Sequence, residues 1–367
     1  MRIRKFLLLL LLIIFVFLLS GINSFAEEPS FDYSRVYSEA DNSVREMLDE
    51  IGVSSVDTDE LINISFINTV KLIVEIFKGR LKEPLRIILV SVAVLIICSV
   101  STSLSASSIK KDSYYDTVFS FVTLITFVYP LTNAISTAVS SLKVISGFML
   151  SYIPTFTAIA SASGKTASSL TYSSVMLGFA SLLESAASFL AKPIIIFLTV
   201  SVFLSFDNSL SFTRAESFFK KLVTVFLSVS SALFVGLTNL KAGLAMSADS
   251  IAVKGIKLTS GSVIPIIGNS VGDAIASVLG SMELIKNTVG VFGIITICLC
   301  VLPSLSEMLI WYFCLFFLSF VAETVNMRAL ESVIKSIMST LSLINVLLIY
   351  SALIFVLITG NLLSIRG

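Results

Sequence analysis

Long runs of apolar residues dominate this chain and leave few folds open to it. Successive apolar windows cover residues 85–104, 117–139, 144–163, 172–191, 193–206, 222–240, 289–303, 306–322 and 342–363. A helix needs about 20 apolar residues to cross a bilayer, so the windows that start at residues 193 and 289 are short for a full crossing. The sequence predicts an all-α, polytopic helical membrane protein with about 7–9 spans.

Composition narrows the possible functions. Hydrophobic residues make up 56% of the chain and charged residues 13%, against about 25% charged residues in a soluble domain. A net charge of +1 argues against binding to nucleic acid, and the absence of histidine removes histidine-based triads and histidine-ligated zinc. No phosphate-binding loop, dinucleotide fingerprint or EF-hand pattern occurs. We therefore expect no catalysis, no cofactor and no metal.

The first 26 residues have the order of a secretory signal peptide. Basic residues at positions 2, 4 and 5 precede an apolar run at 6–19, and the small residues Ser24 and Ala26 follow it. The run is too short for a comfortable span, which favours a cleaved signal over the alternative of an uncleaved anchor. Cleavage would place the start of the next segment, residues 27–83, outside the cytoplasm.

The segment at 27–83 carries much of the acidic charge and two helical patterns. Apolar residues recur at intervals of three and four over residues 33–51 and again over residues 66–77. This spacing predicts two amphipathic helices. They would pack together, lie on the membrane or dock a partner.

Prolines divide the apolar body of the chain. Pro193 and Pro303 each interrupt a long apolar run without a polar loop, and Pro154 and Pro265 lie in glycine- and serine-rich segments. Because proline removes a backbone donor and ends or kinks a helix, the runs at Pro193 and Pro303 are predicted to form tight helical hairpins.

The same prolines belong to an internal repeat. The proline segments at 154 and 265, the interrupting prolines at 193 and 303, and E-S-x-x-K elements at 216–220 and 331–335 recur in one order, about 110 residues apart. This predicts a first pair of helices at 84–143 and membrane units at 144–252 and 253–367. The alternative is that apolar helices resemble one another in composition. Units whose proline segment crosses the membrane would be parallel, and units whose segment turns back would be inverted.

Each E-S-x-x-K element lies in an amphipathic stretch. One apolar stripe runs over residues 210–226, and the other comprises Met327, Leu330, Ile334, Ile337 and Leu341, with charged residues opposite. Such helices usually lie in the membrane interface, and the sequence predicts that position for both.

Residues 254–287 are too polar for an ordinary span and too regular for a linker. Small residues repeat there every four positions beside a polar stripe. The small residues are Gly268, Gly272, Ala276 and Gly280, and the stripe includes Asn269 and Asp273. A small-residue helix face permits close approach of a neighbouring backbone, so these positions are candidates for helix packing or a gate. Ordinary packing with a solvated edge is the alternative.

Acidic residues within the apolar windows are a further class of candidate. Glu184 lies inside the window at 172–191 and is the most deeply placed carboxylate. An intramembrane acid is a functional candidate by default, here for ion coupling. Asp207, Glu307 and Glu323 lie near predicted helix ends, and we expect them at the interface.

Three stretches of the chain resemble the stage III sporulation protein AE family of endospore-forming bacteria. They are LKEPLRIILVSVAVLIICSVSTSL, SYIPTFTAIASASG and, most specifically, VKGIKLTSGSVIPIIGNSVGDAIASVLGSMELIKNTVG. The resemblance implies a membrane subunit of the channel that links mother cell and forespore, in the mother-cell membrane around the forespore. Its implied partners are other stage III sporulation membrane proteins, ring-forming subunits and a separate cytoplasmic ATPase. The resemblance brings no catalytic residues.

Two interpretations therefore remain. The chain is either a structural or permease-like subunit of that channel, or a stand-alone secondary transporter with its substrate between two repeats. The channel interpretation predicts dependence on the small-residue face, for example on Gly272 and Ala276. The transporter interpretation predicts dependence on a buried charge such as Glu184 or Asp273.

Overall fold

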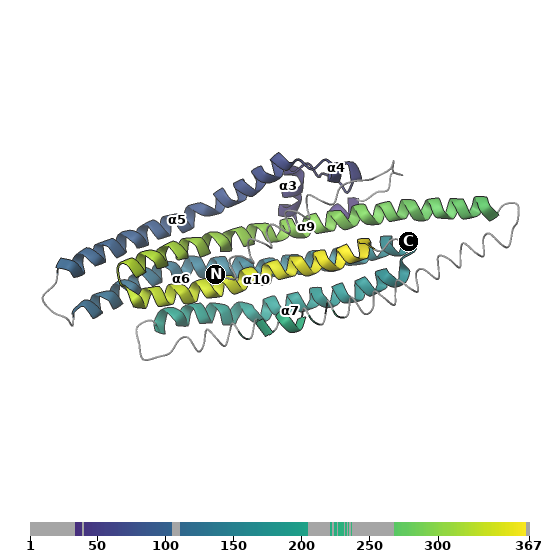
Figure 1. The fold of residues 1–367 in the computed structure, drawn as a ribbon. Helices are drawn as coiled ribbons and strands as arrows, with labels where there is room; N and C mark the ends of the chain where they lie inside the picture. Colours follow the sequence, from purple (N-terminus) through teal and green to yellow (C-terminus); the bar gives the residue numbers. More distant parts are fainter. Residues whose placement is uncertain are drawn as a thin grey trace.

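The chain folds into a bundle of long antiparallel helices (Figure 1). The computed structural model describes residues 34–38, 40–104, 111–204 and 268–364, with scattered positions between 221 and 236. All regular elements in these residues are helices, which confirms the predicted all-α class for the described part. The long helices are α5 (Phe66–Leu104), α6 (Lys111–Ala162), α7 (Thr166–Leu204), α9 (Gly268–Thr324) and α10 (Arg328–Ser364).

Two tight turns join the long helices into hairpins. Residues 163–165 connect α6 to α7, and residues 325–327 connect α9 to α10. Gly164 and Asn326 have positive φ angles of 83° and 64°. The next N–H in each turn bonds a carbonyl five residues back, which is the Schellman arrangement that satisfies the end of a helix. These bonds join Lys165 to Ala160 and Met327 to Ala322.

The residues before α5 form a small helical lobe, residues 34–63, on the side of α9. This N-terminal lobe contains α2 (Ser34–Ser38), α3 (Asn42–Glu50) and α4 (Thr58–Ile62). The hydroxyls of Thr58 and Thr288 are 2.8 Å apart, and the rings of Tyr37 and Phe292 lie 6.1 Å apart. The apolar pattern predicted over residues 33–51 therefore docks on the chain's own membrane body. Its buried residues are Val36, Ala40, Val44, Leu48 and Ile51.

α5 joins the N-terminal lobe to the bundle. It begins at Phe66 and continues through Pro84 to Leu104 without a break. The boundary predicted between residues 83 and 84 thus lies inside one helix. The second amphipathic pattern, at residues 66–77, forms the first turns of α5.

The hairpins predicted at Pro193 and Pro303 are wrong. α7 continues from Thr166 to Leu204 through Pro193, and α9 continues from Gly268 to Thr324 through Pro303. Proline costs a helix about 3 kcal/mol. In α9, buried residues on both sides of Pro303, such as Val301 and Ser304, show that packing against neighbouring helices holds its two halves in line. These prolines therefore mark weak points inside long helices, and the chain does not reverse at them.

Three helices of the described part contain segments long and apolar enough to cross a membrane. The segments are Ile125–Ala162, Ser277–Thr324 and Leu330–Leu363. The predicted count of about 7–9 spans is not confirmed, because pairs of predicted windows fall within single helices. The windows at 117–139 and 144–163 both lie in α6, and those at 289–303 and 306–322 both lie in α9.

The second amphipathic stripe lies inside the bundle and not in a membrane interface. Its five residues, 327 to 341, are each 4% exposed or less. Met327 is the residue directly before α10, and the other four lie in the first turns of that helix, which continues to Ser364. Glu331 and Lys335 form an ion pair on the same turns. The pattern correctly indicated an apolar face, but protein covers it. The stripe at 210–226 lies mostly outside the described residues.

The two helices that carry the interrupting prolines, α7 and α9, run in the same direction through the bundle (Figure 1). A shared direction for corresponding helices favours parallel units over inverted ones. Pro265 and the element at 216–220 lie outside the described residues. The repeat itself therefore stays a prediction.

Candidate functional site

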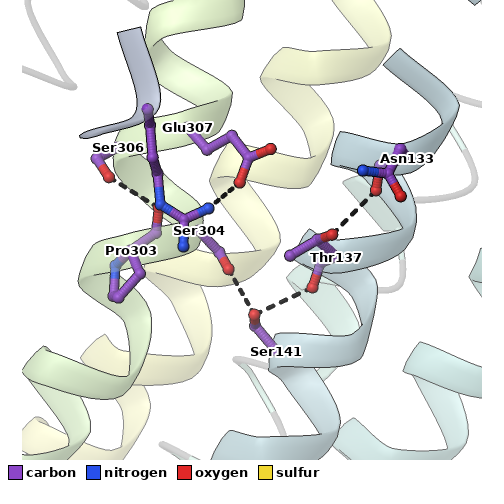
Figure 2. Close-up of polar contacts among 8 residues, drawn as sticks. Asn133, Thr137, Ser141, Pro303, Ser304, Ser306 and Glu307 are labelled. Atoms are coloured by element: carbon purple, nitrogen blue, oxygen red, sulfur yellow. Dashed lines mark hydrogen bonds and ion pairs between the residues drawn. The ribbon is translucent and has the colours of Figure 1, made fainter. Parts of the chain in front are cut away.

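Polar side chains from α5, α6 and α9 meet where Pro303 interrupts α9 (Figure 2). At 1.5 Å per residue, Pro303 lies about 22 Å along α9 from Thr288, which bonds the N-terminal lobe. We call the group the Pro303 polar cluster. Its members are Arg80, Asn133, Thr137, Ser141, Ser304, Ser306 and Glu307.

The part of the cluster on α6 is a ladder of residues four positions apart, which share one helix face. The hydroxyl of Thr137 donates to the carbonyl of Asn133, and that of Ser141 donates to the carbonyl of Thr137, both at 3.1 Å. The hydroxyls of Ser141 and Ser304 then bond each other across the interface (Figure 2). Asn133 and Thr137 are exposed, whereas Ser304 is buried. The ladder thus leads from the bundle surface to a buried contact.

The part of the cluster on α9 surrounds a defect in that helix. Pro303 has no N–H, so the carbonyl of Leu299 lacks its helical donor. The hydroxyl of Ser306 donates to the carbonyl of Pro303 at 2.8 Å. Serine hydroxyls that bond their own helix in this way weaken and bend it. This section of α9 therefore has fewer backbone constraints than a regular helix and several hydroxyls that can exchange partners.

An ion pair ties this section to α5. The guanidinium of Arg80 pairs with the carboxylate of Glu307, which lies one turn after Pro303. The side chains are 34% and 17% exposed. Charges at membrane depth are expensive unless they are paired. Glu307 has such a partner in Arg80, which lies 227 positions away along the chain, and its predicted place at the membrane interface stays a prediction.

A second section of α9 is held by close packing at two glycines that the sequence analysis missed. A Cβ on Gly293 would lie 2.4 Å from Cζ of Tyr152, and a Cβ on Gly290 would lie 2.5 Å from Cδ2 of Leu363. The hydroxyl of the buried Tyr152 donates to the carbonyl of Val289 at 2.8 Å. The signal that could have found them is a pair of glycines three apart in the apolar run at 289–303.

The tyrosine at this contact belongs to an aromatic stack inside the bundle. The ring of Tyr152 stacks on Phe148 and Phe156 of α6, with centroids 5.3 and 5.4 Å apart, and lies 5.7 Å from Phe355 of α10. Phe156 meets Tyr172 of α7 edge to face at 5.2 Å. The stack fixes the ring that fills the space beside Gly293.

The predicted small-residue face begins in the first turns of α9, which extend past the other helices (Figure 1). Gly280 is exposed, and no atom lies within 4 Å of a Cβ placed on it. Within the described chain this position has no covering helix. The other residues of the face, at 268, 269, 272, 273 and 276, have helical backbones, and their side-chain surroundings lie outside the described residues. The packing or gate role stays a prediction.

The remaining predicted positions are spread over the bundle. Glu184 lies on the exposed side of α7 and not inside the bundle. Pro154 is exposed on α6, and Pro193 lies within α7. Neither joins the Pro303 polar cluster. Among the residues that the structure describes, no group of three histidine, cysteine, aspartate or glutamate side chains could hold a metal ion.

Comparison with known proteins identifies the family of the chain. The sequence profile described as stage III sporulation protein AE matches residues 43–364. Stage III sporulation protein AE of Bacillus subtilis (strain 168) is 25% identical over 228 residues, which are 60% of this chain and 55% of that protein. The chain thus matches about half the length of this curated relative. No solved structure matches the chain. Because the profile covers most of the sequence, including the Pro303 polar cluster, the chain belongs to the stage III sporulation protein AE family.

Proposed function

We propose that this chain is a multi-pass membrane subunit of the sporulation channel between mother cell and forespore. It sits in the mother-cell membrane around the forespore and has a structural or permease-like role without catalysis. Its partners are other stage III sporulation membrane proteins, ring-forming subunits and a separate cytoplasmic ATPase. The family match over residues 43–364 carries this proposal.

The shape of the described chain supports a role in an assembly. The predicted signal peptide would place the N-terminal lobe on the exported side, where its exposed surface can meet partners. On that same side, the first turns of α9 extend past the other helices (Figure 1). The exposed Gly280 lies in this extension. A helix end that no other helix of the described chain covers suits a contact with another subunit.

In this role, α9 changes shape at the Pro303 polar cluster. The break at Pro303 lowers the resistance of α9 to bending. The Arg80–Glu307 ion pair links α5, and through it the N-terminal lobe, to the turn after the break. A partner that moves the lobe would therefore act on α9 beside its weakest point.

A stand-alone secondary transporter is the second candidate. The Arg80–Glu307 ion pair favours it, because paired charges at membrane depth also occur in ion-coupled transport. This candidate requires solute flux by the chain alone, whereas the channel subunit requires its partners.

Crosslinking and affinity purification from sporulating cells test the proposal. We expect a tagged chain to recover other sporulation membrane proteins and the ATPase, and a Gly280→Leu variant to recover less of them. Recovery without any such protein would contradict the channel subunit. Solute flux in liposomes that contain only this chain, abolished by Glu307→Gln, would support the transporter instead.

A further inference from the structure

Two of the described lysines are buried near the turn between α6 and α7. The side chain of Lys286 on α9 is 0% exposed, and Lys165, the last residue of the turn, is 4% exposed. Lysine is almost never fully buried unless it is paired, because its ammonium loses strong hydration. Neither lysine contributes to the Pro303 polar cluster.

The protein charges around Lys286 do not balance it. The nearest carboxylate oxygen, from Glu283, is 3.7 Å from Nζ, which is too long for a hydrogen bond. No other hydrogen-bond partner of this Nζ occurs in the part of the chain that the structure describes. Lys165 is close enough for its positive charge to act unfavourably on Lys286. The partly exposed Glu283 is thus the one carboxylate placed near Lys286 in the described part of the chain, and the positive charge of Lys165 adds to the imbalance.

The surroundings of the two lysines suit an anion. Thr288, two residues after Lys286, bonds the N-terminal lobe. The lysines therefore lie at the level of the lobe, at the bundle end opposite the α9–α10 turn (Figure 1). α7 begins directly after Lys165, so the positive end of its dipole faces this turn. Buried hydroxyls of Ser163 and Ser168 lie in the same stretch.

We propose that Lys165 and Lys286 bind a phosphate group. One net negative charge would compensate this imbalance, and phosphate oxygens can accept hydrogen bonds from both ammonium groups. Glu283, 31% exposed, marks the side on which the site reaches the surface. The phosphate comes either from the headgroup of a phospholipid at the membrane edge or from free inorganic phosphate. This inference does not depend on the proposed sporulation role.

Phosphate binding by the full chain in detergent tests the proposal. We expect inorganic phosphate to raise the thermal unfolding temperature more than sodium chloride at equal ionic strength, and Lys286→Met and Lys165→Gln to lose this shift. Removal of an uncompensated buried charge is compatible with folding, so Lys286→Met should remain folded. Lys143→Gln is the matched control, because Lys143 is exposed on α6.

Native mass spectrometry separates the two sources of phosphate. If a phospholipid occupies the site, phosphatidylglycerol should co-purify with the unmodified chain and with Lys143→Gln, and fall at least tenfold in Lys286→Met. If free phosphate occupies it, only the shift with inorganic phosphate should depend on the lysines. An equal shift with chloride would overturn the proposal. Phosphate and lipid effects that are unchanged in both lysine variants would overturn it as well.

Discussion

Two sections of α9, about three turns apart, are held in different ways. The glycine section, residues 289–293, is held by close packing against Tyr152 of α6 and Leu363 of α10. The proline section, residues 303–307, is held by hydroxyl bonds to α6 and by an ion pair with α5. Packed contacts are lost when a helix shifts, whereas hydroxyl and charged groups can exchange partners. The comparison suggests that the glycine section anchors α9 and that the proline section allows it to move.

The largest effect is expected in the glycine section. Gly293→Ala should lower the free energy of unfolding by about 1–3 kcal/mol, because a Cβ would overlap the buried ring of Tyr152. Gly280→Ala is the matched control, since its Cβ meets no atom within 4 Å. It should be neutral or stabilise α9 by up to about 1 kcal/mol. Chemical unfolding in detergent measures the free energy of unfolding of both variants. Equal losses would contradict the anchoring role of the glycine section.

Removal of the ion pair should have a smaller effect on stability. Glu307→Gln leaves Arg80 unpaired and should lower the free energy of unfolding by about 1–2 kcal/mol, a reduced figure because Arg80 is 34% exposed. The exchange Arg80→Glu with Glu307→Arg should recover most of that loss. Glu323→Gln, on an exposed acid of the same helix, is the control. A charge exchange that is no better than the single variants would show that the pair itself contributes little.

The hydroxyl contact between α6 and α9 should be weaker still. Ser141→Ala and Ser304→Ala are each expected to cost about 0.5–1.5 kcal/mol. Because the two hydroxyls bond each other, the double variant should lose less than both single losses combined. The exposed Ser140→Ala provides the baseline. Additive losses at Ser141 and Ser304 would show that the bond between the two hydroxyls does not stabilise the proline section.

The smallest effect concerns the N-terminal lobe beside the glycine section. Burial alone would raise the pKa of Glu60, but hydrogen bonds from the N–H groups of Ser54 and Ser55 lower it below the ordinary 4.5. A folded-state pKa below the unfolded one gives stability that is present above pH 4.5 and lost as the pH falls through the folded pKa.

Protection of α3 and α4 from an acid-stable protease should therefore hold at pH 7 and decline below pH 4.5. Glu60→Gln should reduce the protection at pH 7 and flatten its dependence on pH. A dependence as steep as in the unmodified chain would exclude Glu60 as its source.

The sequence allowed some of these features to be predicted, because helical periodicity reveals which residues share a face. The stripe from Met327 to Leu341 was correctly identified as apolar, and so was the pattern over residues 33–51. Periodicity does not reveal what covers a face. The stripe from Met327 to Leu341 was expected to face lipid, but protein covers it. The same limit applies to hairpins at prolines, since tertiary packing decides whether a long helix continues.

The candidate site was harder to predict, because its contacts join residues far apart in sequence. Arg80 and Glu307 are separated by 227 positions, and Tyr152 and Val289 by 137. A single sequence contains no signal for such pairings. The sequence predicts Glu184 instead, because it lies in an apolar window, but the structure puts it on the exposed side of α7.

The yield of heat-resistant spores per amount of chain in the membrane tests the contrast between the two sections most directly. A strain that lacks the native gene would carry Glu307→Gln, Gly293→Ala or the control Gly280→Ala. We predict that Glu307→Gln lowers the spore yield at a normal membrane level, whereas Gly293→Ala lowers the membrane level and the yield in proportion. A normal yield with Glu307→Gln at a normal membrane level would contradict a functional role for the proline section of α9.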